Sequence, residues 1–459
     1  MIRLATKIAP SNENHPTLAA MKPLAATRSV GLRLLFVRLS CLGLSCLGLL
    51  CGCDVPIDSF EPNRLFAKRL ELNEGLELEP LRDELDALLV ELFGTPDLPT
   101  WPRWLSEDPR LSGLVSLERL QRAAGAVRSD GSDVHFGLYR EHCILCHGIA
   151  GNGLGATSRL LNPYPRDFRL GKFKFKSTPL GSRPTRDDLA RLLRDGIPGT
   201  SMPAFRLLPE DDLQALIDYV IYLSIRGEVE RALLSEAAFE LDWEQGERWW
   251  GDETSQTATM ELVRKIADKW STAADHVPPL PPRPAGLPLV GDELSSDEAR
   301  ENLADSIAHG RELFQGQLAN CASCHGMQGA GDGTVTDYDD WTKDWTSNAG
   351  LNPQEKSQIK PMLALGALRP RHILPRNLQS GIYRGGASPE DIVTRIVHGI
   401  EGTPMPAAPL QPENALGLKP DEVWDLVNFL LSLPTQEASS TSHSRSSLRD
   451  EKSPNEVTQ

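Results

Sequence analysis

Two pairs of segments in the chain place apolar residues every three or four positions, which is the spacing of one face of a helix. The first pair comprises "TRDDLARLLRD" (185–195) and "PEDDLQALIDYVIYLS" (209–224), and the second comprises "SPEDIVTRIVH" (388–398) and "KPDEVWDLVNFLLSL" (419–433). The shorter segment of each pair opens with Thr or Ser followed three residues later by Asp, which is a helix-capping signal. The pattern therefore predicts a short helix followed by a longer one, twice.

Matching turn residues surround the two helix pairs. A glycine turn leads to a methionine beside a proline in "GIPGTSMPAF" (196–205) and again in "GIEGTPMPAA" (399–408). The dipeptide Pro-Arg stands upstream in both copies, in "YPRDF" (164–168) and in "LPRNL" (374–378). One module is thus used twice. This repeat predicts a mostly α fold with two tandem domains.

Composition divides the rest of the 459-residue chain. The proline-rich stretch "VPPLPPRPAGLPL" indicates a stiff linker, and the Ser/Thr-rich C-terminal end indicates disorder. The expected organisation is a lipoprotein-type signal peptide over 1–53, an N-terminal helical segment of unknown role over 54–129, a first domain over 130–228, an acidic, Pro-rich linker over 229–299, a second domain over 300–434 and a disordered tail over 435–459.

Each predicted domain begins with the motif C-x-x-C-H. The residues are Cys143, Cys146 and His147 in the first copy, and Cys321, Cys324 and His325 in the second. This motif attaches c-type haem: the two thiols add across the vinyl groups of the porphyrin, and the adjacent histidine becomes an axial iron ligand. A zinc site would need further Cys or His pairs nearby, and a thioredoxin-like redox site would need a βαβ setting. The sequence therefore predicts two covalently bound haem c groups.

The order of motif, short helix, glycine turn, methionine and closing helix resembles the class I cytochromes c in both halves of the chain. The methionine sulfur is the sixth iron ligand in that family, so the resemblance gives this role to Met202 and Met405. A thioether is soft and uncharged, and His/Met ligation raises the reduction potential of the iron. His372 and Met362, in the long connection of the second module, are minor rivals to Met405.

The resemblance also suggests the surroundings of the two ligand histidines. A downstream proline carbonyl orients the imidazole in this family, which makes Pro163 or Pro165, and Pro375, the candidates here. Arg166 and Arg376, in the repeated Pro-Arg, are candidate partners of the haem propionates, with surface salt bridges as the alternative.

The N-terminal region predicts export. Basic residues precede the apolar run "LSCLGLSCLGLLCGC" (39–53), which is shorter than the roughly 20 residues that a membrane span needs. Its end, "LCGC", resembles the cleavage box of bacterial lipoproteins and makes Cys53 the candidate lipidated residue. An uncleaved anchor helix and plain secretion are the alternatives. We expect the protein on the periplasmic or extracytoplasmic side, anchored to a membrane through an N-terminal lipid or signal anchor.

The charge of the chain limits the kinds of partner that it can bind. The formal net charge of −15 argues against nucleic acid, because binding phosphates needs a basic face. "RLGKFKFK" (169–176) is locally basic, so Lys172, Lys174 and Lys176 are hypothesised to dock an acidic partner while the acidic second domain docks a basic one. The second module is also longer between its ligand His and Met, and the extra length is expected to cover the haem edge or dock a partner.

These features predict a dihaem c-type cytochrome that carries single electrons between respiratory partners, with no substrate turnover of its own. A "YPRDF…GTSMPAF" module also resembles the cytochrome subunits of quinol-oxidising and terminal-oxidase complexes, so a complex subunit and a free carrier are equally credible. Two alternatives remain: a dihaem peroxidase or the cytochrome subunit of a dehydrogenase, and a haem-containing sensor or complex-assembly subunit. A peroxidase would need one iron with a vacant or displaceable ligand.

Overall fold

The computed structural model describes residues 56–434 except 335, 409 and 411–416. The predicted signal peptide with Cys53 and the predicted tail from 435 onward lie outside the described residues. The described part is mostly α-helical, as the sequence predicts. None of its helices is both long and apolar enough to cross a membrane.

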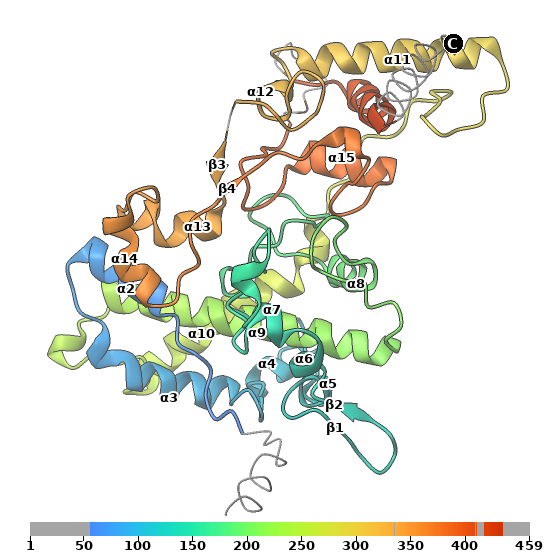
Figure 1. Ribbon diagram of the computed structural model, residues 1–459. Helices are drawn as coiled ribbons and strands as arrows, with labels where there is room; N and C mark the ends of the chain where they lie inside the picture. Colours follow the sequence, from blue (N-terminus) through green and yellow to red (C-terminus); the bar gives the residue numbers. More distant parts are fainter. Residues whose placement is uncertain (1–55, 335, 409, 411–416, 435–459) are drawn as a thin grey trace, which may run out of the picture. The chain divides into compact units, whose positions relative to one another are not determined.

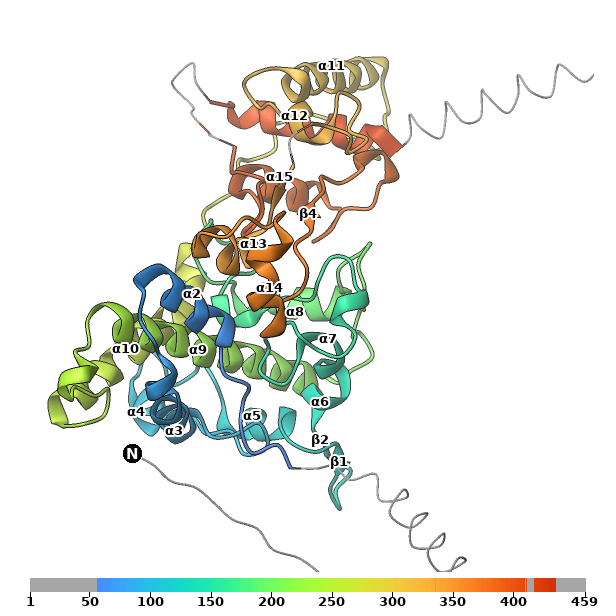
Figure 2. The same ribbon diagram turned by 60° about the vertical axis from the view of Figure 1, so that its left-hand side comes forward.

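The N-terminal segment packs on the longest helix of the described chain, α9 (Glu210–Phe239). Figure 1 and Figure 2 both place its helices beside α9. Asp218, fully buried in α9, accepts hydrogen bonds from the Ser116 backbone N at 2.8 Å and from the Arg186 guanidinium at 2.6 Å. Residues 54–129 therefore help to build the core of the first domain. The helices are α2 (Arg64–Glu74), α3 (Arg82–Phe93), α4 (Arg103–Glu107) and α5 (Leu117–Ala123).

The first domain contains the two helices predicted for it. The short one is α8 (Arg186–Asp195), and its predicted capping box between Thr185 and Asp188 is confirmed. The long one, α9, continues to Phe239 and so runs through the domain boundary placed at 228. Gly227 lies inside this helix. A Cβ there would lie 2.4 Å from Arg169 Cγ, so the glycine permits Arg169 to pack closely against the helix. Upstream lie a short antiparallel hairpin, β1 (Arg128–Ser129) and β2 (His135–Phe136), then α6 (Leu138–His142) and α7 (Ile144–His147).

The segment expected to be a linker packs on both domains. Its helix α10 (Glu253–Ser271) lies on α9, where Trp270 Nε1 donates a hydrogen bond to Glu228 at 2.9 Å. The proline-rich stretch then runs along the second domain. There, Pro281 O accepts from Trp424 Nε1 at 3.1 Å, and Pro288 O accepts from Asn428 Nδ2 at 3.0 Å. These bonds satisfy buried polar groups of the last helix.

The second domain has its own core between α11, α15 and the helix over 420–434. α11 lies close against the last helix at Gly310, where a Cβ would lie 2.0 Å from Asp425 O. The predicted capping box between Ser388 and Asp391 is confirmed at the start of α15. The elements are α11 (Asp297–Gln315), α12 (Ala322–His325), the paired strands β3 (Asp337–Tyr338) and β4 (His372–Ile373), and α15 (Pro389–His398).

The extra length of the second module forms a small unit of its own. It contains α13 (Asp340–Trp345) and α14 (Lys356–Ala364), which share a separate apolar core. Figure 1 and Figure 2 show both helices beside α2 of the N-terminal segment. Asp344 forms ion pairs with Arg69 at 2.6 Å and Arg231 at 2.8 Å. The insertion therefore packs against the first domain and its N-terminal segment.

Candidate functional site

In each domain the cysteine motif occupies a single helical turn. The turn is α7 in the first domain, where His147 N donates to Cys143 O at 2.8 Å, and α12 in the second, where His325 N donates to Cys321 O at 2.9 Å. None of the four motif cysteines forms a disulfide. One turn thus presents two thiols and an imidazole together, as covalent haem attachment requires.

A backbone carbonyl orients each ligand histidine. His147 Nδ1 donates to Arg166 O at 3.0 Å, and His325 Nδ1 donates to Arg376 O at 3.2 Å. Because Nδ1 carries the proton, Nε2 of each ring is the nitrogen left to bind a metal. Burial lowers the pKa of His147 to about 4 and also lowers the pKa of His325, so both rings favour the neutral form that binds iron.

These bonds correct the expectation that a proline carbonyl orients the ring. Pro165 O instead faces Gly153, where a Cβ would lie 2.8 Å away, and Pro375 O faces Gly331 at 2.9 Å. Both glycines have positive φ, +71° and +80°. The proline carbonyl therefore packs against the turn that follows the cysteine motif, and the next carbonyl along the chain reaches the imidazole. Pro163, the other candidate of the first copy, is not the acceptor either.

The two methionine loops share one hydrogen-bond pattern. In the first, Ile197 N donates to Met202 O at 3.1 Å, and Met202 N donates to the Thr200 hydroxyl at 3.1 Å. In the second, Ile400 N donates to Met405 O at 3.1 Å, and Met405 N donates to the Thr403 hydroxyl at 3.2 Å. The threonine hydroxyl also donates to the isoleucine carbonyl at 2.8 Å in both loops. Each methionine is partly buried and is held by the same backbone frame.

The rival residues lie in other environments. Met362 is fully buried in the separate core of α13 and α14. His372 belongs to β4, where the centre of its ring lies 4.3 Å from the centre of the Tyr338 ring. A further histidine, His398, stands just before the methionine loop where the first copy has Asp195; it is buried at the end of α15, with neither ring nitrogen hydrogen-bonded within the described chain. Each of these side chains belongs to a different element from the loop that carries Met405.

Comparisons with known families match both modules. Residues 135–220 match the family of subunit III of cbb3-type cytochrome c oxidase, and residues 307–434 match the cytochrome c family. Each of these two segments is therefore a cytochrome c domain, so the chain contains the two domains of a dihaem class I c-type cytochrome. Its two cytochrome c domains imply haem c binding and electron transfer.

No curated protein matches this cytochrome. Among solved structures, it is similar to a chain of the reducing HAO-like protein complex of Kuenenia stuttgartiensis, with 25% sequence identity and a TM-score of 0.39. That similarity covers 65% of this chain and 94% of the other.

The cytochrome also has partly buried cations that fit the two carboxylates of a haem. In the first domain, burial lowers the pKa of Arg166 to about 10 and that of Lys174 to about 7. In the second, the Nε atoms of Arg376 and Arg384 are buried and have no hydrogen-bond partner in the described chain. An anionic propionate would offset the cost of burying these charges. The haem chemistry that the motif implies therefore fits the residues present.

The sequence analysis did not predict Lys174 and Arg384 as cations of the candidate haem sites. They stand at matching positions, because "GKFK" (171–174) and "GIYR" (381–384) follow the two Pro-Arg segments at the same distance. Extending the repeat by these four residues would have found both cations.

The three lysines proposed to form a free docking face are paired within the cytochrome. Lys172 forms an ion pair with Asp340, Lys174 lies 3.8 Å from Asp339, and Lys176 lies 3.2 Å from Glu401. All three acids belong to the second domain or its insertion. The basic cluster therefore joins the two domains of this chain, which corrects the hypothesis of a face for an outside acidic partner.

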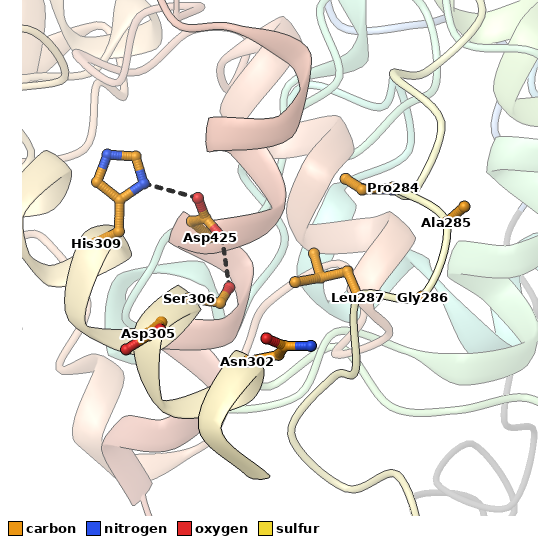
Figure 3. A pocket seen from close by; sticks show the side chains of 9 residues that line it. All are labelled: Pro284, Ala285, Gly286, Leu287, Asn302, Asp305, Ser306, His309 and Asp425. Atoms are coloured by element: carbon orange, nitrogen blue, oxygen red, sulfur yellow. Dashed lines mark hydrogen bonds and ion pairs between the residues drawn. The ribbon is translucent and has the colours of Figure 1, made fainter. Parts of the chain in front are cut away.

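A pocket in the second domain lies beside α11 and the last helix (Figure 3). The Asp425 carboxylate faces Ser306 and His309, accepting a hydrogen bond from each; the His309 Nδ1 bond measures 2.8 Å. Both carboxylate oxygens are thus engaged in holding α11 to the last helix. The described residues contain no group of three or more His, Cys, Asp or Glu side chains placed to hold a metal ion.

Proposed function

We propose that this cytochrome carries single electrons between respiratory partners on the outer side of the cytoplasmic membrane. One haem c is attached to Cys143 and Cys146, and the other to Cys321 and Cys324. The observation that carries the proposal is the hydrogen-bond pattern that the two methionine loops share.

The axial ligands of this proposal are His147 with Met202 in the first domain and His325 with Met405 in the second. A bound haem c supplies one-electron chemistry at its iron, and two protein ligands leave that iron no open position for substrate. The chain contributes a neutral imidazole fixed through Nδ1 and a thioether on a loop stiffened by prolines. Such sites pass electrons without turning over a substrate.

The first domain suggests the kind of partner. Its match to the family of an oxidase subunit supports a role as the cytochrome subunit of a quinol-oxidising or oxidase complex, with a free carrier as the other form of the same function. A dehydrogenase is a further possible electron donor. Lipidation at Cys53 would keep the protein at the membrane surface beside such partners.

Re-oxidation by membranes tests the proposal. The reduced holoprotein is mixed with isolated membranes of the source organism and oxygen, and the loss of the reduced haem absorbance is followed. We expect rapid re-oxidation that cyanide blocks. A double variant, Cys321→Ser with Cys324→Ser, should lose the second haem and the part of the signal that belongs to it.

A peroxidase would give a different result. If hydrogen peroxide oxidised the reduced protein with multiple turnovers while membranes left it reduced, the electron-carrier proposal would be wrong. The same test separates a sensor, which would exchange electrons with neither.

A further inference from the structure

Trp341, in helix α13 of the insertion, contacts the segment that orients the first ligand histidine. Its indole Nε1 donates a hydrogen bond to Asp167 O at 3.1 Å. The guanidinium carbon of Arg166 lies 3.4 Å from the centre of its ring. Arg166 O in turn accepts the hydrogen bond from His147 Nδ1. A single residue, Arg166, therefore connects the indole to the ligand histidine.

The same indole packs against the second methionine loop. A Cβ on Gly402 would lie 2.2 Å from Cζ3 of Trp341, so the ring rests directly on this glycine. The backbone of the neighbouring Asp340 also donates to Gly402 O at 3.1 Å. Gly402 stands three residues before Met405. Trp341 thus joins the histidine side of the first site to the methionine side of the second.

A reciprocal contact lies at the first methionine loop. Arg384 of the second domain donates to Gly199 O at 3.2 Å, and a Cβ on Gly199 would lie 3.1 Å from the Arg376 guanidinium. Arg376 is the residue whose carbonyl orients His325. Gly199 of the first methionine loop therefore contacts the two arginines of the second site. Gly402 of the second loop contacts Trp341, which lies beside the first site.

Charged groups hold α13 in this position. At its start, Asp339 and Asp340 pair with Lys174 and Lys172 of the first domain. At its end, Asp344 is partly buried between Arg69 and Arg231. A helix held at both ends gives its aromatic side chain a fixed place, which an electron path between two sites requires.

We propose that Trp341 bridges the two haem sites: it positions Arg166 toward the first haem and sets the rate at which the two haems exchange an electron. With a haem bound in each domain, one electron would pass from a ferrous iron to the ferric iron of the other haem; the indole would be neither oxidised nor reduced, and no proton would move. The inference rests on the function proposed above, because it needs a haem in each domain.

Trp341 also affects the potential of the first haem. Its ring covers one face of the Arg166 guanidinium and keeps water from it. A drier site disfavours the ferric state, which carries the extra positive charge. Removing the ring should therefore lower the potential of the first haem and leave the potential of the second haem unchanged.

The test compares variants of the full-length holoprotein. Pulse radiolysis delivers less than one electron per molecule, and the absorbance then reports how fast the electron redistributes between the haems. A spectroelectrochemical titration of the same samples gives both potentials. Trp341→Leu removes the ring. Trp341→Phe keeps a ring but loses the bond to Asp167 O, and it serves as the milder variant if the leucine protein folds poorly. Trp345→Phe changes the other tryptophan of α13, which is buried in the core of the insertion.

We expect Trp341→Leu to slow the redistribution by about tenfold, the effect of roughly 1.4 kcal/mol on a barrier. The potential of the first haem should fall by about 59 mV, which is a tenfold change in a one-electron equilibrium. Trp341→Phe should lie between Trp341→Leu and the unchanged protein, and Trp345→Phe should change neither quantity. Redistribution at the wild-type rate in Trp341→Leu, with both potentials unchanged, would overturn the inference.

The result is separable from the function proposed above. If membranes fail to re-oxidise the unmodified protein while Trp341→Leu still slows redistribution, the respiratory role is wrong and the bridge stands. If membranes re-oxidise the protein and Trp341→Leu has no effect, only the bridge is wrong.

Discussion

The candidate methionine ligands are held by their backbone. Met202 lies between a hydrogen bond from Ile197 N to its carbonyl and one from its own N to Thr200, and Met405 repeats this arrangement. The frame does not involve the side chain, so truncating the methionine should leave the loop in place. This makes each thioether a clean target for substitution.

Met202→Ala and Met405→Ala should each remove the sixth ligand from one haem. Because a thioether favours ferrous iron, the potential of that haem should fall by on the order of a few tenths of a volt, within the range that axial ligands control. Spectroelectrochemical titration measures the change. Met362→Leu is the control, since Met362 packs in the core of the insertion; a similar fall in that variant would contradict the assignment.

Residue chemistry was the most predictable part of this protein. A cysteine motif and a methionine beside proline are local signals, and the sequence carries each of them twice. The carbonyl that orients His147 was placed one residue too early, because the choice depends on how closely Pro165 approaches Gly153 in space. Periodicity and motif spacing hold no information on that contact.

At the scale of elements, a glycine with positive φ ends the short helix of each module. Gly196 follows α8 with a φ of +65°, and a Cβ there would lie 2.7 Å from Met202 O and 2.6 Å from the carbonyl carbon of Pro203. Gly399 has the same role after α15, against Pro406 and Ala407. The glycine therefore lets the methionine loop fold back on the end of the helix.

Gly196→Ala should displace the first methionine loop. Gly196 has a φ of +65° and a ψ of −162°, a region essentially restricted to glycine that costs a residue with a Cβ about 1–3 kcal/mol, and the clash with Met202 O adds to this. We expect a lower free energy of unfolding in denaturant and new carbon monoxide binding at the reduced first haem. Gly75→Ala is the control for a positive-φ glycine at the end of a helix, because Gly75 has a φ of +68° and no neighbouring atom within 4 Å of the added Cβ. Equal effects of the two changes on carbon monoxide binding would refute this account of the turn.

The helices themselves were predictable to the extent that their pattern is local. The capping residues and apolar spacing located α8 and α15 correctly. The length of α9 was not predicted, because α10 and the N-terminal helices, which lie outside the repeated module, also pack on this helix. Packing against segments of the chain that are distant in the sequence leaves no periodic pattern within the repeated module.

At the scale of the whole molecule, ion pairs between distant segments join the two domains. Lys172 and Asp340 are 168 residues apart in the chain, and Arg191 meets Asp391 at 2.7 Å across 200 residues. Sequence alone shows a basic cluster and an acidic loop but not that they neutralise each other. The docking of the insertion was therefore the least predictable feature of the structure.

Glu401→Gln should destabilise this contact. The Glu401 carboxylate accepts from Gly181 N at 2.6 Å and pairs with Lys176, whose side chain is 3% exposed. Removing one partner of a buried pair leaves the other charge uncompensated, at a cost of about 3 kcal/mol in the free energy of unfolding. Glu422→Gln is the control, because Glu422 pairs with the exposed Lys419 and should change stability by less than about 1 kcal/mol. Equal stability of both variants in denaturant would show that the Lys176 pair does not hold the domains.

The central claim is that both irons are held by a histidine and a methionine of this chain. A carbon monoxide difference spectrum of the dithionite-reduced holoprotein tests it directly. The account predicts no spectral change, because Met202 and Met405 fill the sixth position of both irons. A clear shift at either haem would reveal an open or labile iron, contradict the assignment at that site, and direct attention to peroxide and small-molecule turnover.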